Sequence, residues 1–177
     1  MEIKLFRAYL DKVPVIYFQE YGEYFAKVIL GIKDQGITSA IGILAKSISQ
    51  HWPEELWDSV LVPIPSSPAN NLRRGYSHTK LLARSLARAV PGITVVDLLI
   101  SAKPRLDQSN LGFDQRKKNL AGAFQVRNLN VSRKILLFDD ILTTGATLQA
   151  AKQSLELAGF EVAGYVVLSR VRPLKPE

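Results

Sequence analysis

The segment from Lys134 to Leu148 constrains the fold more than any other part of the chain. Ile135 to Phe138 is a short, almost purely apolar run, which is typical of a strand buried on both faces of a parallel sheet. Asp139 and Asp140 follow this run, and a polar turn then opens directly onto a helical pattern. A strand, a turn and a helix in this order predict an α/β fold with a mostly parallel central sheet flanked by helices.

The turn after the two acids predicts an anion site. It combines three hydroxyl groups with a glycine, and it runs into a helix N-terminus where backbone N–H groups are free to bind a phosphate. Two carboxylates would repel a phosphate, so we expect Asp139 and Asp140 to hold sugar hydroxyls, directly or through Mg²⁺. The alternative is a strand end with two solvated acids and an ordinary polar turn. The residues expected to hold the phosphate are Thr143, Thr144, Gly145, Ala146 and Thr147.

This stretch resembles the phosphoribosyl pyrophosphate (PRPP) motif of type I phosphoribosyltransferases. The resemblance implies the fold of that class with a small N-terminal hood, and it implies PRPP and Mg²⁺ as ligands. Asp139 and Asp140 would then act as catalytic, PRPP-binding and magnesium-binding acids, with the metal held directly or through water. Purine transferases that act on 6-oxopurines resemble this motif but carry an acid at the position of Thr143. A threonine is no base at neutral pH, so hypoxanthine and guanine are disfavoured as acceptors.

Composition sets the class of protein. A chain of 177 residues with 47% hydrophobic and 22% charged residues is expected to form one domain with a real core. It has no cysteine, which excludes disulfides and cysteine-bound zinc. We find no apolar run of membrane-spanning length and no signal-peptide pattern at the start, so we expect a cytoplasmic protein without membrane insertion.

The net charge of +7 is unevenly distributed. Residues 1–60 carry 6 basic and 8 acidic side chains, whereas residues 61–177 carry 17 basic and 8 acidic ones. The basic part holds the acid-and-turn motif, which suits a polyanionic small molecule, but it would equally suit nucleic acid.

We expect a single domain 1–177 with a hood or cover, residues 1–57, in which no residue pattern looks catalytic, and a core sheet, residues 58–177. Two short strands are expected around Asp11 and Lys12, followed by amphipathic helices over 21–33 and from Thr38 onward. Lys33 ends the first of these helices and is expected to offset the helix dipole, although it could also reach over a site.

A second strand–loop–helix unit begins at Asp58. Its polar loop contains Ser66, Ser67, Arg73 and Arg74 and predicts a phosphate site, and the alternative is a solvated loop. The resemblance to type I phosphoribosyltransferases implies that these four residues bind the pyrophosphate of PRPP. His78, just after this loop, is a weaker candidate. The residues from Ile93 to Ile100 predict another strand.

The segment 101–121 is long and polar, which predicts a basic lid over a bound polyanion. Lys103 and Arg105 are predicted to be catalytic by stabilising the leaving pyrophosphate. Arg116, Lys117 and Lys118 are predicted lid or nucleic-acid contacts. A solvated charge run is the third reading of the segment.

Four stretches together resemble the ComF family of phosphoribosyltransferase-like competence proteins. They are Tyr21-Gly22 with Ile32-Lys33, Val62 to Pro65 with Arg74-Gly75-Tyr76 and Leu81 to Arg84, Gln108 to Phe124, and Phe138 to Thr147. Many members carry an N-terminal zinc module with four cysteines, which this chain lacks, so no zinc is expected. The family more often shows Phe-Asn-Gln where this chain has Tyr76, Ser77 and His78.

The resemblance implies a role in DNA uptake during natural transformation, with phosphoribosyl transfer to an unknown acceptor. Its implied partners are PRPP or another phosphoribosyl compound, single-stranded DNA and a competence helicase, and a homodimer is left open. The alternative is a non-catalytic module that binds a nucleotide or single-stranded DNA.

Overall fold

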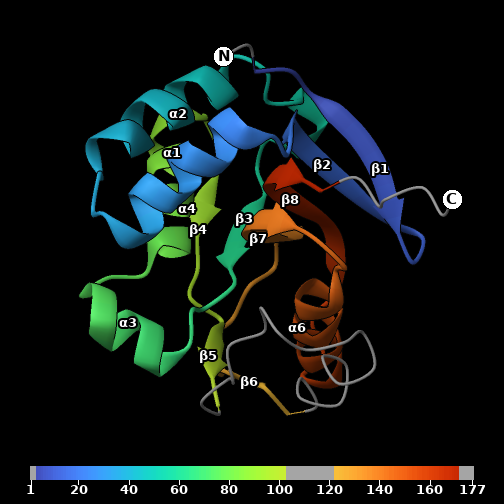
Figure 1. Ribbon diagram of the computed structural model, residues 1–177. Coiled ribbons are helices and arrows are strands. Elements are labelled where there is room, and N and C mark those ends of the chain that lie inside the picture. Colours follow the sequence, from blue (N-terminus) through green and yellow to red (C-terminus); the bar gives the residue numbers. More distant parts are fainter. Residues whose placement is uncertain (1–2, 103–121, 172–177) are drawn as a thin grey trace, which may run out of the picture.

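The computed structural model describes residues 3–102 and 122–171 and is built around a six-stranded sheet with the order β1-β2-β8-β7-β3-β4 (Figure 1). The strands pair in parallel except for β1, which runs antiparallel to β2. This confirms the predicted α/β class with a mostly parallel sheet. The strands are β1 (Phe6–Leu10), β2 (Val13–Glu20), β3 (Val60–Pro63), β4 (Thr94–Val95), β7 (Ile135–Leu142) and β8 (Val162–Arg170).

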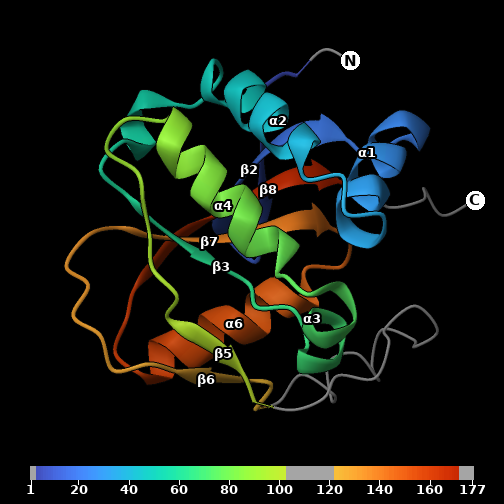
Figure 2. The same ribbon diagram turned by 90° about the vertical axis from the view of Figure 1, so that its left-hand side faces the viewer.

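Helices cover both faces of this sheet, as Figure 2 shows. One face carries α1 (Glu23–Asp34), α2 (Ser39–Ser49) and α4 (His78–Ala89). The other face carries α6 (Ala146–Leu157) and a small antiparallel sheet of β5 (Leu99–Ser101) and β6 (Phe124–Val126). A short helix, α3 (Pro68–Arg74), and a 3₁₀ turn, Glu54–Leu56, lie in the connections.

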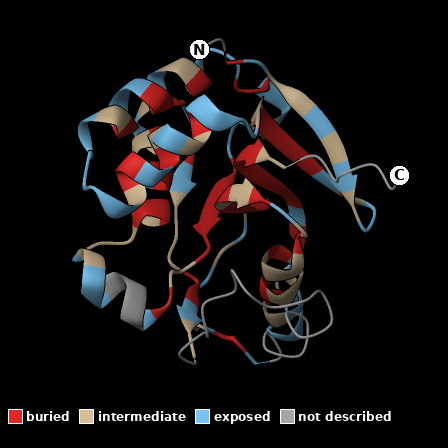
Figure 3. Cartoon of the chain, in the orientation of Figure 1, coloured by how far each residue is buried: buried red, intermediate tan, exposed pale blue. Residues whose placement is uncertain are grey.

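The central strands are buried on both faces because apolar side chains alternate between two cores (Figure 3). Along β7, Leu136 and Phe138 pack towards α1, α2 and α4, while Ile135 and Leu137 pack towards α6. The continuous apolar run predicted a strand that is buried on both faces, and the packing of β7 between the two cores agrees with that prediction.

The connections that leave β3 and β7 run in opposite directions. From β3 the chain crosses through α4 to β4, whereas from β7 it crosses through α6 on the opposite face to β8. The two strands are direct neighbours, with Pro63 opposite Phe138 and the Ile64 amide donating to the Phe138 carbonyl at 2.8 Å. Ligands in open α/β sheets bind where the strand order reverses in this way, at the carboxyl ends of the strands. The reversal therefore marks the edge beside Phe138.

Three details differ from the sequence prediction. The strands β1 and β2 were placed in the hood, but they extend the main sheet because β2 pairs in parallel with β8. The loop after β3 contains the helix α3, which opens at Pro68, a residue whose fixed φ suits a first helical position. The single strand predicted from Ile93 to Ile100 is interrupted around Asp97 and forms two strands. The first, β4, pairs with β3, and the second, β5, pairs with β6.

Of the expected hood, the helices α1 and α2 do not belong to the sheet. A covering role for residues 21–57 stays a prediction. Within the described ranges, 3–102 and 122–171, we find no helix of the length and apolarity needed to cross a membrane.

Candidate functional site

Strand β7 carries the two acids beyond the end of its neighbour. The sequence predicted that the strand ends at Phe138, but it continues to Leu142 because β8 still pairs with it as far as Arg170. The pairing with β3 stops at Phe138. Asp139 and Asp140 therefore lie at a step in the sheet, with strand β8 on one side and the loop after β3 on the other.

The two acids point to opposite faces of the sheet because side chains alternate along a strand. Asp140 shares the phase of Leu136 and Phe138, which pack towards α1 and α4. Asp139 shares the phase of Ile135 and Leu137, which pack towards α6. Asp140 is buried and Asp139 is half-buried. The adjacent acids thus have separate surroundings.

Asp140 is held by two cationic or donor groups from different helices. Its Oδ2 lies 2.5 Å from Nζ of Lys33 in α1 and 3.1 Å from Nε2 of His78 in α4. Thr79 Oγ1 lies 3.3 Å from the same histidine nitrogen. Burial by itself would raise the pKa of Asp140, but the His78 hydrogen bond and the Lys33 charge outweigh it and hold that pKa well below its ordinary value. Asp140 is therefore an ionised, paired carboxylate.

Asp139 has the opposite electrostatic character. Its Oδ1 accepts a hydrogen bond of 2.9 Å from the Asp140 amide. Burial, reinforced by the negative charge of Asp140, raises the pKa of Asp139 to about 8. Asp139 is the acid on the face of α6, the helix that the polar turn opens.

The turn after β7 has the shape that the sequence predicted. Gly145 is the N-cap residue of α6 in a left-handed conformation, with φ 78° and ψ −3°. A Cβ atom there would overlap the side chain of Leu10, so the turn packs against the β1–β2 hairpin. The Ala146 amide lies 3.4 Å from Thr144 Oγ1, and the first backbone bond of the helix runs from Gln149 to the Gly145 carbonyl at 3.0 Å.

The hydroxyls of the turn differ in exposure. Thr143 is exposed, whereas Thr144 and Thr147 are half-buried. The amides of a first helical turn lack intrahelical acceptors, so this turn offers donors beside Asp139. Residues 139–147 are brought together as one continuous strand end, turn and helix start.

The loop after β3 reaches the same edge of the sheet, because Pro63 lies opposite Phe138. Ser66 and Ser67 lie three and four residues after Pro63, and the Ser66 hydroxyl is buried with no hydrogen-bond partner in the described structure. The two arginines of the expected pyrophosphate site are engaged elsewhere. Arg74 Nη2 lies 3.0 Å and Arg73 Nη2 lies 3.4 Å from Oδ1 of Asp34, at the end of α1.

Lys33 and His78 are the two site residues that the sequence undervalued. The expectation that Lys33 serves the helix dipole is incomplete, since its ammonium group reaches Asp140. A signal for both residues was present in the helical phase. Lys33 lies four residues after Ile29 on the buried face of α1, and His78 lies four residues before Leu82 on the buried face of α4.

Magnesium fits this site only together with a ligand. Among residues 3–102 and 122–171 no group of three or more His, Cys, Asp or Glu side chains could hold a metal ion. Mg²⁺ commonly binds one or two carboxylates together with waters and substrate phosphates, so Asp139 and Asp140 could supply the protein's share. Lys103, Arg105, Arg116, Lys117 and Lys118 lie outside the described residues, and their predicted roles stay predictions.

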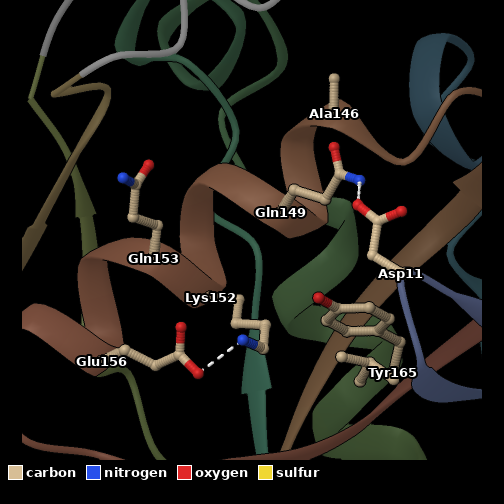
Figure 4. Close-up of a pocket in the computed structure, with 8 residues that line it drawn as sticks. Asp11, Ala146, Gln149, Lys152, Gln153, Glu156 and Tyr165 are labelled. Carbon is tan, nitrogen blue, oxygen red and sulfur yellow. Dashed lines mark hydrogen bonds and ion pairs between the residues drawn. The ribbon is translucent and has the colours of Figure 1, made fainter.

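A pocket of about 460 Å³ flanks α6 near the predicted phosphate turn and shares Ala146 with it (Figure 4). Four of the polar residues that line it form two pairs: Gln149 donates to Asp11, and Lys152 lies 2.5 Å from Glu156. Burial, with the nearby charges of Glu156 and Asp11, raises the pKa of Tyr165 beyond its ordinary value. Asp139 and Asp140 do not line this pocket, which meets the candidate site only at Ala146.

Comparison with known proteins gives relatives among competence proteins. The chain is 30% identical over 104 residues to Competence protein F from Haemophilus influenzae, which is 57% of this chain and 45% of that protein. It is 34% identical over 98 residues to Competence protein ComFC from Streptococcus pneumoniae, which is 55% of this chain and 42% of that protein. The chain thus matches less than half the length of these curated relatives. No family model matches it.

These relatives confirm the predicted resemblance: over rather more than half of its length, the chain is similar in sequence to competence proteins of the ComF type. Among solved structures, a hypoxanthine phosphoribosyltransferase from Staphylococcus aureus is similar with a TM-score of 0.38 and 16% identity, covering 79% of this chain and 71% of that one. A likeness at this TM-score is too weak to support a conclusion about function.

Proposed function

We propose that this protein binds PRPP at the carboxyl end of β7 and transfers its phosphoribosyl group to an acceptor that the chain does not identify. One observation carries the proposal. The acids and the donor-rich turn lie where the connections of β3 and β7 diverge, which is the place where open α/β sheets bind nucleotides and their precursors. The turn at Gly145 would hold the 5′-phosphate, and Asp139 and Asp140 would hold the ribose hydroxyls.

Phosphoribosyl transfer requires stabilisation of a departing pyrophosphate more than a protein nucleophile. Mg²⁺, when bound with PRPP, would neutralise part of that charge. Asp140, together with Asp139 once it has lost its proton, would hold the ion directly or through water. The Ser66 hydroxyl and neighbouring backbone would meet the pyrophosphate from the loop after β3. Lys103 and Arg105 would approach from the segment 103–118.

We further propose that the protein works in competence, as its relatives do by name. The family resemblance supports DNA uptake with single-stranded DNA and a helicase as partners, and the sequence pattern supports the cytoplasm as its location. One structural observation favours nucleic acid as a second ligand class. Lys80, Arg84 and Arg88 recur every fourth residue on α4, so they share a helix face, and Asp97 is the acid that pairs with the first two. A non-catalytic module would use such a face without turnover.

Calorimetric titration with PRPP, with and without Mg²⁺, tests the first proposal, and release of pyrophosphate in the presence of candidate acceptors tests turnover. Hydrogen exchange over residues 103–118 separates the two ligand classes. Protection by PRPP with Mg²⁺ supports the enzyme, whereas protection by single-stranded DNA alone, with an affinity that falls steeply with salt, supports the binding module. No change with either ligand would reject both roles of this segment.

A further inference from the structure

Three consecutive residues in the last turn of α1 contact the site and the connection beside it. The Ile32 carbonyl accepts a hydrogen bond from the Tyr76 hydroxyl, in the connection between α3 and α4. Asp34 Oδ1 accepts from Arg74 through Nε at 3.2 Å and Nη2 at 3.0 Å. Lys33, between these two anchored residues, reaches Asp140. The helix end is therefore tied on both sides of the lysine that enters the site.

The contacts that Lys33 and His78 make to Asp140 converge on one oxygen. Lys33 Nζ and His78 Nε2 both meet Oδ2, so Oδ1 is the oxygen on which these two contacts do not fall. The side chain of Lys33 is 23% exposed and that of Asp140 is 6% exposed, which makes this a largely desolvated pair. Charge-assisted hydrogen bonds in such surroundings are directional, and two of them fix the plane of a carboxylate.

We propose that Lys33 and His78 are positioning residues, which orient the Asp140 carboxylate through Oδ2 and leave Oδ1 to bind the ribose, so that α1 and α4 sense whether the site is occupied. This inference rests on the proposed PRPP site. Neither residue needs to touch the ligand. Each comes from a different helix, so the site depends on how α1 and α4 are packed against β7.

A lysine on the same helix provides a matched control. Lys27 is paired with Glu23 at 2.7 Å, and its side chain is 68% exposed, so it has the same charge and the same helix without access to Asp140. Lys33→Met and His78→Leu remove the contacts to Oδ2, whereas Lys33→Arg keeps a cation and His78→Gln keeps an N–H donor at similar reach. Lys27→Met removes a charge from α1 alone.

The experiment measures the PRPP dissociation constant by calorimetry, with Mg²⁺, for each variant that unfolds cooperatively. We expect Lys33→Met and His78→Leu to weaken binding by about tenfold or more, and the two conservative variants to recover most of it, because the lost bonds are made to a charged group. Lys27→Met should bind as the wild type does. Amide exchange in α1 should slow when PRPP is added to the wild type and should not respond in Lys33→Met.

A purely structural role would lower the melting temperature without changing the dissociation constant or the response of α1. Binding by Lys33→Met and His78→Leu at the affinity of the wild type would overturn the inference and leave the proposed function standing. Equal weakening by Lys27→Met would also overturn it, since the effect would then be one of net charge. A wild-type protein that takes up no PRPP would reject the proposed function and this inference with it.

Discussion

Gly145 is the residue at which the fold and the candidate site can be tested by one substitution. Its φ of 78° lies in the left-handed region, and an added Cβ would overlap the side chain of Leu10. Gly159, just after the other end of the same helix, has φ 86° and nothing within 4 Å of an added Cβ. The two glycines therefore share the backbone strain that alanine would introduce and differ in the contact.

The expected losses follow from these two terms. A non-glycine residue in the left-handed region costs roughly 1–2 kcal/mol, which applies to both Gly145→Ala and Gly159→Ala. Displacing Leu10 adds about 1 kcal/mol at Gly145, the low end for an overpacked contact, since Leu10 is half-buried and can rotate. We expect Gly145→Ala to lower the free energy of unfolding by about 2–3 kcal/mol and Gly159→Ala by about 1–2 kcal/mol.

Urea denaturation of both variants measures the difference, and Leu10→Ala completes a double-mutant cycle with Gly145→Ala. A coupling of about 1 kcal/mol, with Leu10→Ala relieving the clash, is the result that the geometry requires. PRPP affinity should fall in Gly145→Ala and stay unchanged in Gly159→Ala, because only the first moves the phosphate turn. Equal losses of stability in the two variants, together with no coupling to Leu10, would refute the reasoning.

Three further predictions concern single contacts of the site. Thr144→Val removes a hydroxyl at similar volume and should weaken PRPP binding by about 1–3 kcal/mol, measured by calorimetry; unchanged affinity would remove Thr144 from the phosphate site. Tyr76→Phe removes the hydrogen bond to Ile32 and should lower the free energy of unfolding by about 1 kcal/mol in urea, and no change would mean that the hydroxyl does not anchor α1. Asp139→Asn should flatten the fall in the free energy of unfolding with rising pH. The pKa of this acid is 3.8 in the unfolded chain and about 8 in the folded chain, so only the unfolded chain is ionised between these values. The stability that the protonated acid provides is therefore complete below pH 3.8 and is lost as the pH rises to about 8. Urea midpoints from acidic to alkaline pH measure this slope, and parallel curves for the variant and the wild type would contradict it.

The strand, turn and helix of residues 135–157 were predictable because their signals are local. An apolar run, a glycine at the turn and a helical repeat each act over a few residues, and tertiary packing reinforces them here. The helix α2 is a similar case, since Ile41, Leu44, Ala45 and Ile48 are all buried as the periodicity predicted. The membership of β1 and β2 in the main sheet depends on pairing with β8, about 150 residues away in sequence, and no local pattern encodes such a pairing.

The different surroundings of the two acids could be predicted from the sequence. Adjacent residues on a strand face opposite sides, so an Asp-Asp pair continuing a buried strand must enter two environments. The partner of each acid then depends on which helices cover which face. Lys33 and His78 lie in phase with buried apolar residues of α1 and α4, and a polar side chain at such a position requires a partner. Asp140 is that partner on this face of the sheet. Asp139 lies on the opposite face, beside the turn at which α6 begins.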